Sequence, residues 1–206
     1  IIYDASIADG NKFFESISLT LRAFLFGTMT DLYGDVPYSE RLQADDGVFF
    51  PKYDKQVDIY KGVLADLAQA NTALSDANIS SFKIDPASDI LYSGDADKWR
   101  KFANSLRMRY CMRLFNKKDE MKQAGVDIIA EFNDAASHCF TGNSDDAAVA
   151  YIGTTKDNSA QGGLLNSPNP HYYLKPCKTI IDTLKSLNDP RLQRWTMPVL
   201  RKWDFT

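Results

Sequence analysis

The sequence predicts an all-α protein in which antiparallel helix pairs form a helical-repeat scaffold. Apolar side chains recur at steps of three and four along several segments of about 20 residues, which is the period of an amphipathic helix. Glycine, proline and aspartate stand at the ends of these segments, where such residues cap or stop helices. The pattern is lost from Cys139 to Tyr173, where glycines and prolines predict a long irregular loop of functional use.

The first helix is expected from about Asn11 to Tyr33. Its core-facing stripe is predicted to be Phe14, Ile17, Leu21, Phe24, Thr28 and Leu32. A second apolar set on another face predicts that the helix is sandwiched between others: Phe13, Leu19, Ala23 and Phe26. Gly34 is expected to end the helix, because glycine adopts the left-handed terminal conformation and Pro37 keeps its predecessor out of the helical region.

A second helix is predicted from Asp54, as its N-cap, to about Ser75. Its stripe is Val57, Tyr60, Leu64, Leu67, Asn71 and Leu74. After a polar linker, the carboxylates of Asp95 and Asp97 are expected to cap a third helix, which runs from about Asp97 to Asn116. The stripe of this helix is Trp99, Phe102, Ala103, Leu106 and Tyr110.

A fourth helix is expected from about Asp119 to Ser137, and its short connection to the third predicts an antiparallel hairpin. Its face is predicted to be Met121, Gly125, Ile128, Phe132 and Ala135. A fifth helix is expected to start near Pro176 and to stop at residues 188–190. It carries Ile180, Ile181, Leu184 and Leu187. Between the fourth and fifth helices, only residues 147–152 are compatible with a short strand.

Two arginines of the third predicted helix continue its apolar stripe at steps of three and four, Arg109 and Arg113. They are therefore expected on the core-facing side, either as an anion-binding patch or in structural ion pairs. The end of the first helix carries Asp31 and Asp35, and buried arginines need such partners. Pairing with these carboxylates or with main-chain carbonyls is the favoured interpretation.

Composition and charge argue against several classes of protein. The 24 Lys and Arg against 27 Asp and Glu give a net charge of −3, without the basic stripe that nucleic acid requires. No run approaches about 18 consecutive apolar residues, so no membrane span is predicted. The three cysteines, Cys111, Cys139 and Cys177, lack metal spacing and are expected to be free, buried thiols.

The sequence carries no recognisable signature of catalysis or of metal binding. The two histidines, His138 and His171, have no ligands at metal spacing, although Cys139 follows the first of them. None of the GxSxG, GxGxxG, GxxxxGK[ST] and HExxH motifs occurs. We therefore expect no catalytic residue, no metal and no cofactor, and a protein that is not an enzyme.

Aromatic and amide side chains gather in the irregular C-terminal part of the chain. The candidate ligand-binding residues are Trp203, Tyr172, Tyr173, Asn169 and Asn166. Rings that stack on sugar faces, with amides that bond the hydroxyls, form non-catalytic glycan sites, so these residues are candidates for binding a neutral oligosaccharide. The alternative is that these aromatic residues belong to the core.

Several runs of residues carry a resemblance to a known family: LRAF at 21–24, DLYGDVPY at 31–38, DILYSGD at 89–95, FANSLRMR at 102–109 and LNDPRL at 187–192. Together they resemble the SusD/RagB family of nutrient-binding outer-membrane lipoproteins, and most of all the branch described as starch-binding associating with outer membrane. The matching runs are scaffold motifs, so no binding residue is carried over by position.

The resemblance implies a single SusD-like domain over residues 1–206, with tetratricopeptide-like helix pairs and a more irregular ligand-binding face. It also implies a surface lipoprotein of the outer membrane in Bacteroidetes-type bacteria, anchored through an N-terminal lipidated cysteine. Such a protein delivers oligosaccharides to a SusC-type TonB-dependent transporter. The start at Ile1 and the end after an apolar-aromatic run lead us to expect a fragment without the anchor segment and the C-terminal part.

Other functions remain open beside the glycan-binding module. One is a helical-repeat docking scaffold without a glycan site of its own, and another is a peptide-binding member of the same family. A hydrolase would require paired carboxylates across a cleft, which nothing in the sequence specifies. Saturable oligosaccharide binding by the isolated protein would distinguish the glycan-binding module from the docking scaffold.

Overall fold

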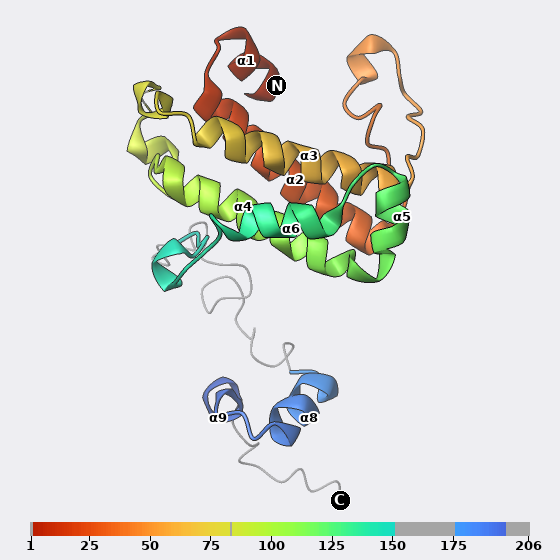
Figure 1. Ribbon diagram of the computed structural model, residues 1–206, viewed down its shortest axis with the longest axis vertical. Coiled ribbons are helices and arrows are strands. Elements are labelled where there is room, and N and C mark those ends of the chain that lie inside the picture. Colours follow the sequence, from red (N-terminus) through yellow and green to blue (C-terminus); the bar gives the residue numbers. More distant parts are fainter. Residues whose placement is uncertain (1, 83, 151–175, 197–206) are drawn as a thin grey trace, which may run out of the picture. The chain divides into compact units, whose positions relative to one another are not determined.

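The computed structural model describes residues 2–82, 84–150 and 176–196 (Figure 1). The chain divides into two compact units, residues 1–149 and 150–206, and each is described by itself. The described residues form helices and loops, and their β pairing is confined to an isolated bridge between Val36 and Asp54. The all-α fold class is thus confirmed.

The first unit is a layered stack of antiparallel helices. Its α-helices are α1 (Ile2–Ala8), α2 (Lys12–Tyr33), α3 (Gln56–Leu74), α4 (Ala96–Arg113), α5 (Lys118–Gln123) and α6 (Ile128–Ala136). Figure 1 shows α3 running back along α2, α4 along α3, and α6 along α4. Short 3-10 turns lie at Ala44–Asp46, Ile79–Ser81, Pro86–Ser88, Phe115–Lys117 and Asn143–Asp145. The hairpin predicted for the third and fourth helices corresponds to α4 and α6.

The core lies where α2, α3 and α4 meet. Its most buried side chains come from all three helices: Leu19, Ala23, Ile59, Val63, Leu64, Leu67, Ala103, Leu106 and Tyr110. Gly27 of α2 permits a close approach of α4, because a Cβ at this position would lie 2.7 Å from Cε1 of Tyr110. The stripes predicted for the second and third helices are largely confirmed, and Asp95 caps α4 by accepting a hydrogen bond from the Lys98 amide.

The stripe predicted for the first helix was wrong. Phe14, Leu21 and Leu32 are exposed. The face buried against the other helices consists mostly of small side chains: Phe13, Ser16, Leu19, Thr20, Ala23, Gly27 and Thr30. Small residues let neighbouring helices come close. The buried hydroxyls of Ser16 and Thr20 donate to carbonyls one turn earlier, and that of Thr30 donates to the Gly34 carbonyl one turn later. In the described part of the chain, the larger apolar face is therefore left uncovered.

The fourth predicted helix is two helices, α5 and α6, because Gly125 ends the first of them. Gly125 has φ +88°, and the amide of Val126 donates to the Met121 carbonyl at 2.9 Å, so the chain closes α5 with a Schellman motif. Asp127 then caps α6 by accepting from the amides of Ile129 and Ala130. Gly125 is thus a stop signal and not part of a helix face.

Asp54 is not the N-cap of α3, as was expected. Its carboxylate accepts hydrogen bonds from the amides of Tyr38 and Ser39, at 3.0 and 2.7 Å, and so closes the preceding loop. Asp35 caps the start of α3 instead, because its Oδ1 accepts a hydrogen bond from the Gln56 amide at 2.9 Å. The carboxylate that caps α3 thus comes from the far end of the preceding loop, which the local sequence before α3 does not reveal.

The second unit contains α8 (Lys178–Ser186) and α9 (Arg191–Trp195) among its described residues. The fifth predicted helix is confirmed as α8. Beyond its last residue, Asn188 takes the left-handed conformation and the Asp189 amide donates to the Leu184 carbonyl. The strand considered for residues 147–152 does not form over residues 147–150, and the other two positions lie outside the described residues. Within the described ranges, no helix combines the length and apolar character needed to cross a bilayer.

Candidate functional site

The predicted ligand-binding residues lie outside the described residues: Asn166, Asn169, Tyr172, Tyr173 and Trp203. The site predicted from them stays a prediction. The described part of the chain offers two other surfaces, a groove along α2 and an exposed loop between α2 and α3. Sequence reasoning anticipated neither surface.

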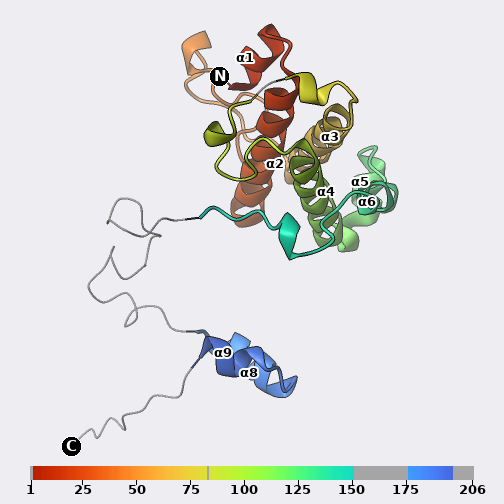
Figure 2. The ribbon, with the colours of Figure 1, turned by 90° about the vertical axis from the view of Figure 1, so that its left-hand side faces the viewer.

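The groove follows the uncovered face of α2 and has a volume of about 730 Å³. Residues of α1 and of the loop that leads into α4 contribute to the walls, and Figure 2 shows both segments beside α2. Most of the lining is aliphatic or aromatic: Ile2, Phe14, Ile17, Leu21, Leu25, Leu42, Ile84, Ile90 and Leu91. This is the face that was predicted to pack into the core.

The cations that line the groove already have partners. Arg22 donates to both oxygens of Asp66 on α3, from Nε at 2.7 Å and from Nη2 at 2.6 Å, and its guanidinium lies 4.7 Å from the centre of the Tyr3 ring. Its hydrogen bonds to Asp66 raise the pKa of Arg22 further, so the charge is permanent. Arg41 donates to the Tyr38 carbonyl at 2.7 Å. Arg22 thus connects α1, α2 and α3, whereas the Arg41 hydrogen bond lies within the loop between α2 and α3.

Asp89, the acidic residue of the groove, is a structural anchor. Its carboxylate accepts from the amides of Leu91, Tyr92 and Gly94 and from the Trp99 indole, at 2.8 to 3.2 Å. Burial alone would raise the pKa of Asp89, but these hydrogen bonds together hold it below its usual value. The DILYSGD run thus binds its own loop to the start of α4.

The groove is suited to apolar surface more than to sugar. Its size is that of a ligand site, but its polar groups are occupied, and sugar hydroxyls need free donors and acceptors. The hydroxyl of Ser18 is an exception, since it has no hydrogen-bond partner among the described residues. The described ranges hold no cluster of three or more His, Cys, Asp or Glu side chains suited to a metal ion.

The arginine prediction was right about one partner and wrong about burial. Arg113 pairs with Asp31, as expected, but it is 41% exposed, and Arg109 is exposed as well. The buried arginine is Arg107, which donates to Glu131 and to Asp134 of α6. The helical register places position 107 toward α6, which the apolar stripe of α4 alone does not reveal.

The cysteines are free, but only Cys111 is buried, and burial raises the pKa of its thiol to about 12. Cys139 is half-buried and Cys177 is exposed, which corrects the expectation of three buried thiols. His138, beside Cys139, is exposed and lies near the hydroxyl of Ser137. Each of the latter two cysteines lies beyond a helix end, where sequence periodicity says little about burial.

In the first unit each long helix runs antiparallel to the one before and packs on it. This is the architecture of a helical-repeat scaffold protein. The chain belongs to the SusD-like family described as starch-binding associating with outer membrane, whose model matches residues 2–203. This family consists of binding proteins associated with the outer membrane. No curated protein matches the chain.

Solved structures agree with this assignment. A SusD/RagB family protein from Bacteroides thetaiotaomicron is 29% identical, with a TM-score of 0.66, over 88% of this chain and 35% of its own. A Bacteroidetes SusD-like protein is 26% identical, with a TM-score of 0.70, over 93% and 36%. A protein named as chitin-binding is 28% identical, with a TM-score of 0.67, over 89% and 36%. The chain thus spans little more than a third of the length of these structures.

Proposed function

We propose that this chain is part of a non-catalytic glycan-binding protein at the bacterial surface, which delivers oligosaccharides to a SusC-type TonB-dependent transporter. The family match over nearly the whole chain is the observation that carries the proposal. The similar protein named as chitin-binding supports a polysaccharide fragment as the ligand. Anchoring in the outer membrane would depend on an N-terminal lipidated cysteine.

The ligand site proposed for this function is the set around Trp203: Tyr172, Tyr173, Asn169 and Asn166. A neutral sugar presents an apolar ring face and many hydroxyls, which aromatic and amide side chains bind together. Replacing Trp203 by Ala is expected to weaken binding by roughly 1 to 3 kcal/mol, as for an aromatic anchor.

Isothermal titration calorimetry with starch and chitin oligosaccharides tests this proposal. Phe115→Ala is a matched control, since Phe115 is a half-exposed ring beside α5. Equal affinity of the wild type and Trp203→Ala would remove Trp203 from the site. Failure of every oligosaccharide to bind the wild type would contradict the glycan-binding function itself.

A docking scaffold is the second candidate, and the groove along α2 favours it. A largely apolar groove on a helical scaffold is a common binding site for an amphipathic helix of a partner protein. Peptide binding by a member of the same family would use similar chemistry. In either case the protein would bind no oligosaccharide, which the same titration reveals.

A further inference from the structure

We propose that the tip of the loop between α2 and α3, residues 36–54, is a contact surface for a neutral oligosaccharide, on which Phe49, Phe50 and Tyr53 are the stacking rings. The inference rests on the proposed glycan-binding function and assigns that function a surface. This surface is distant in sequence from the site proposed around Trp203.

The three rings are unusually exposed. Phe49 is 74%, Phe50 96% and Tyr53 71% accessible to solvent, although they lie within five residues of one another. Aromatic contacts occur elsewhere in the described ranges, for instance between Phe26 and Tyr38, but none joins these three rings to each other. Their faces are therefore available to a ligand. A concentration of exposed apolar side chains of this kind marks an interaction site.

The loop is held firmly at its base. The amide of Asp54 donates to the Val36 carbonyl at 3.1 Å and forms an isolated β-bridge. The Asp54 carboxylate accepts from the amides of Tyr38 and Ser39, and its hydrogen bond from the Ser39 amide leads the causes that lower the pKa of Asp54. The Tyr38 ring packs in turn over Gly62 of α3. The two ends of the loop thus form one fixed support.

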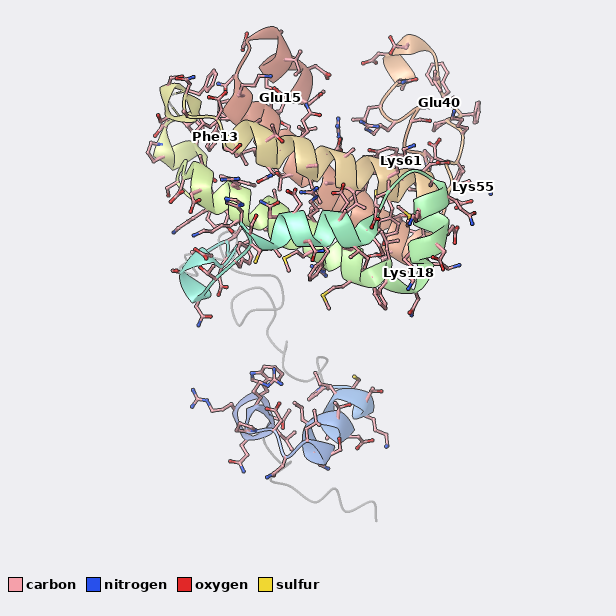
Figure 3. The ribbon with its side chains drawn as sticks, viewed as in Figure 1. Phe13, Glu15, Glu40, Lys55, Lys61 and Lys118 are labelled. Atoms are coloured by element: carbon pink, nitrogen blue, oxygen red, sulfur yellow. The ribbon has the colours of Figure 1, made fainter. Side chains whose placement is uncertain are left out.

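Contacts continue toward the tip, which extends away from the helices in Figure 1. The Lys52 amide donates to Oε2 of Glu40 at 2.8 Å, and Figure 3 shows Glu40 within this loop. The Val48 amide donates to the Gln43 carbonyl at 3.0 Å. A preorganised loop loses little entropy when it binds a ligand.

The chemistry of the tip suits a neutral sugar. Flat rings pack on the apolar face of a pyranose, and the exposed side chains of Asp45, Asp46 and Lys52 provide donors and acceptors for its hydroxyls. The two carboxylates disfavour an anionic lipid surface or an acidic glycan. The groove along α2 lacks this combination of exposed rings and unburied polar groups.

A fluorescent reporter tests direct contact in the full chain. Phe50→Trp is expected to keep the stacking surface and to change its emission in a saturable way during titration with maltoheptaose or chitohexaose. The native tryptophans include Trp203 of the other proposed site, so the wild type sets the baseline, and the matched control Phe115→Trp, at a partly exposed ring beside α5, should respond no more than the wild type does. A response of Phe50→Trp equal to that of the wild type, while calorimetry shows the oligosaccharide bound, would overturn the assignment of this loop.

Calorimetry on Phe49→Ala/Phe50→Ala tests the energetic contribution of the rings. We expect at least one binding event to weaken about tenfold or to disappear, while Phe115→Ala binds as the wild type does. Because both rings are exposed, circular dichroism should show an unchanged helical fold. Binding equal to the wild type would overturn the inference and leave the glycan-binding function standing. No binding by the wild type would overturn both.

Discussion

At the scale of single residues, Arg107 is the ion-pairing centre between α4 and α6. Its side chain is 5% exposed, and it donates from Nε to Glu131 at 2.6 Å and from Nη1 to Asp134 at 2.5 Å. Removing one partner of a fully buried pair costs roughly 3 to 5 kcal/mol. Because Asp134 is 63% exposed and stays hydrated, we expect Arg107→Ala to cost about 2 kcal/mol of unfolding free energy.

Urea denaturation followed by circular dichroism measures this difference. The matched control is Arg109→Ala, two positions along the same helix, where the side chain is exposed. This control should stay within about 0.5 kcal/mol of the wild type. A larger loss for Arg109→Ala than for Arg107→Ala would restore the original interpretation of the helix face and contradict the structure.

At the scale of elements, Asp145 fastens the loop after α6 to α4. Its carboxylate accepts from the Thr141 amide and hydroxyl, at 2.9 and 3.0 Å, and pairs with Lys101 at 3.2 Å. Hydrogen bonding from the Thr141 amide is the largest cause that lowers the pKa of Asp145 to about 2. A carboxyl with a depressed pKa stabilises the fold above its unfolded pKa of about 3.9, and this contribution is lost as the pH falls toward the folded value.

Asp145→Asn should therefore be less stable than the wild type at neutral pH. The difference is expected to shrink as the pH falls from about 4 to about 2, because the wild-type carboxyl is then protonated as well. Urea denaturation over this pH range gives the comparison. A stability difference that stays constant down to pH 2 would show that the Asp145 charge does not hold the loop.

Helix positions and caps could be predicted from the sequence wherever one pattern, such as a single apolar face, was dominant. The stripes of α3 and α4 each have a single apolar face, so periodicity identified them. α2 has two apolar faces. The face with small residues is the buried one, because it lets α4 approach closely at Gly27. Gly125 fitted a helix face by spacing, and only its positive φ shows that it ends α5.

The candidate site was less accessible to sequence reasoning. Periodicity does not distinguish an exposed ring from a buried one. It therefore does not identify Phe49 and Phe50, which lie exposed in a loop between helices. The signal that was available is the pair of adjacent rings, Phe49 and Phe50, separated by Val48 from the Asp45-Asp46-Gly47 turn. The set around Trp203 was chosen on chemistry alone and remains a prediction.

At the scale of the whole molecule, the SusD-like scaffold positions its loops through buried contacts. Core packing among α2, α3 and α4 supports both the loop of residues 36–54 and the α2 groove, and Arg41 and Leu42 of the loop line part of that groove. A scaffold of this kind can vary its ligand through its loops while its helices keep their packing. We expect such loops to bind neutral oligosaccharides in this protein.

Calorimetric titration of the full chain with maltoheptaose and chitohexaose, at about 0.05 M and about 0.5 M NaCl, tests this claim most directly. Binding through aromatic stacking and neutral hydrogen bonds is nearly independent of salt. We therefore predict saturable binding of at least one oligosaccharide, with the same affinity at both concentrations. Absence of binding at both concentrations, or an affinity that falls steeply with salt, would contradict the account.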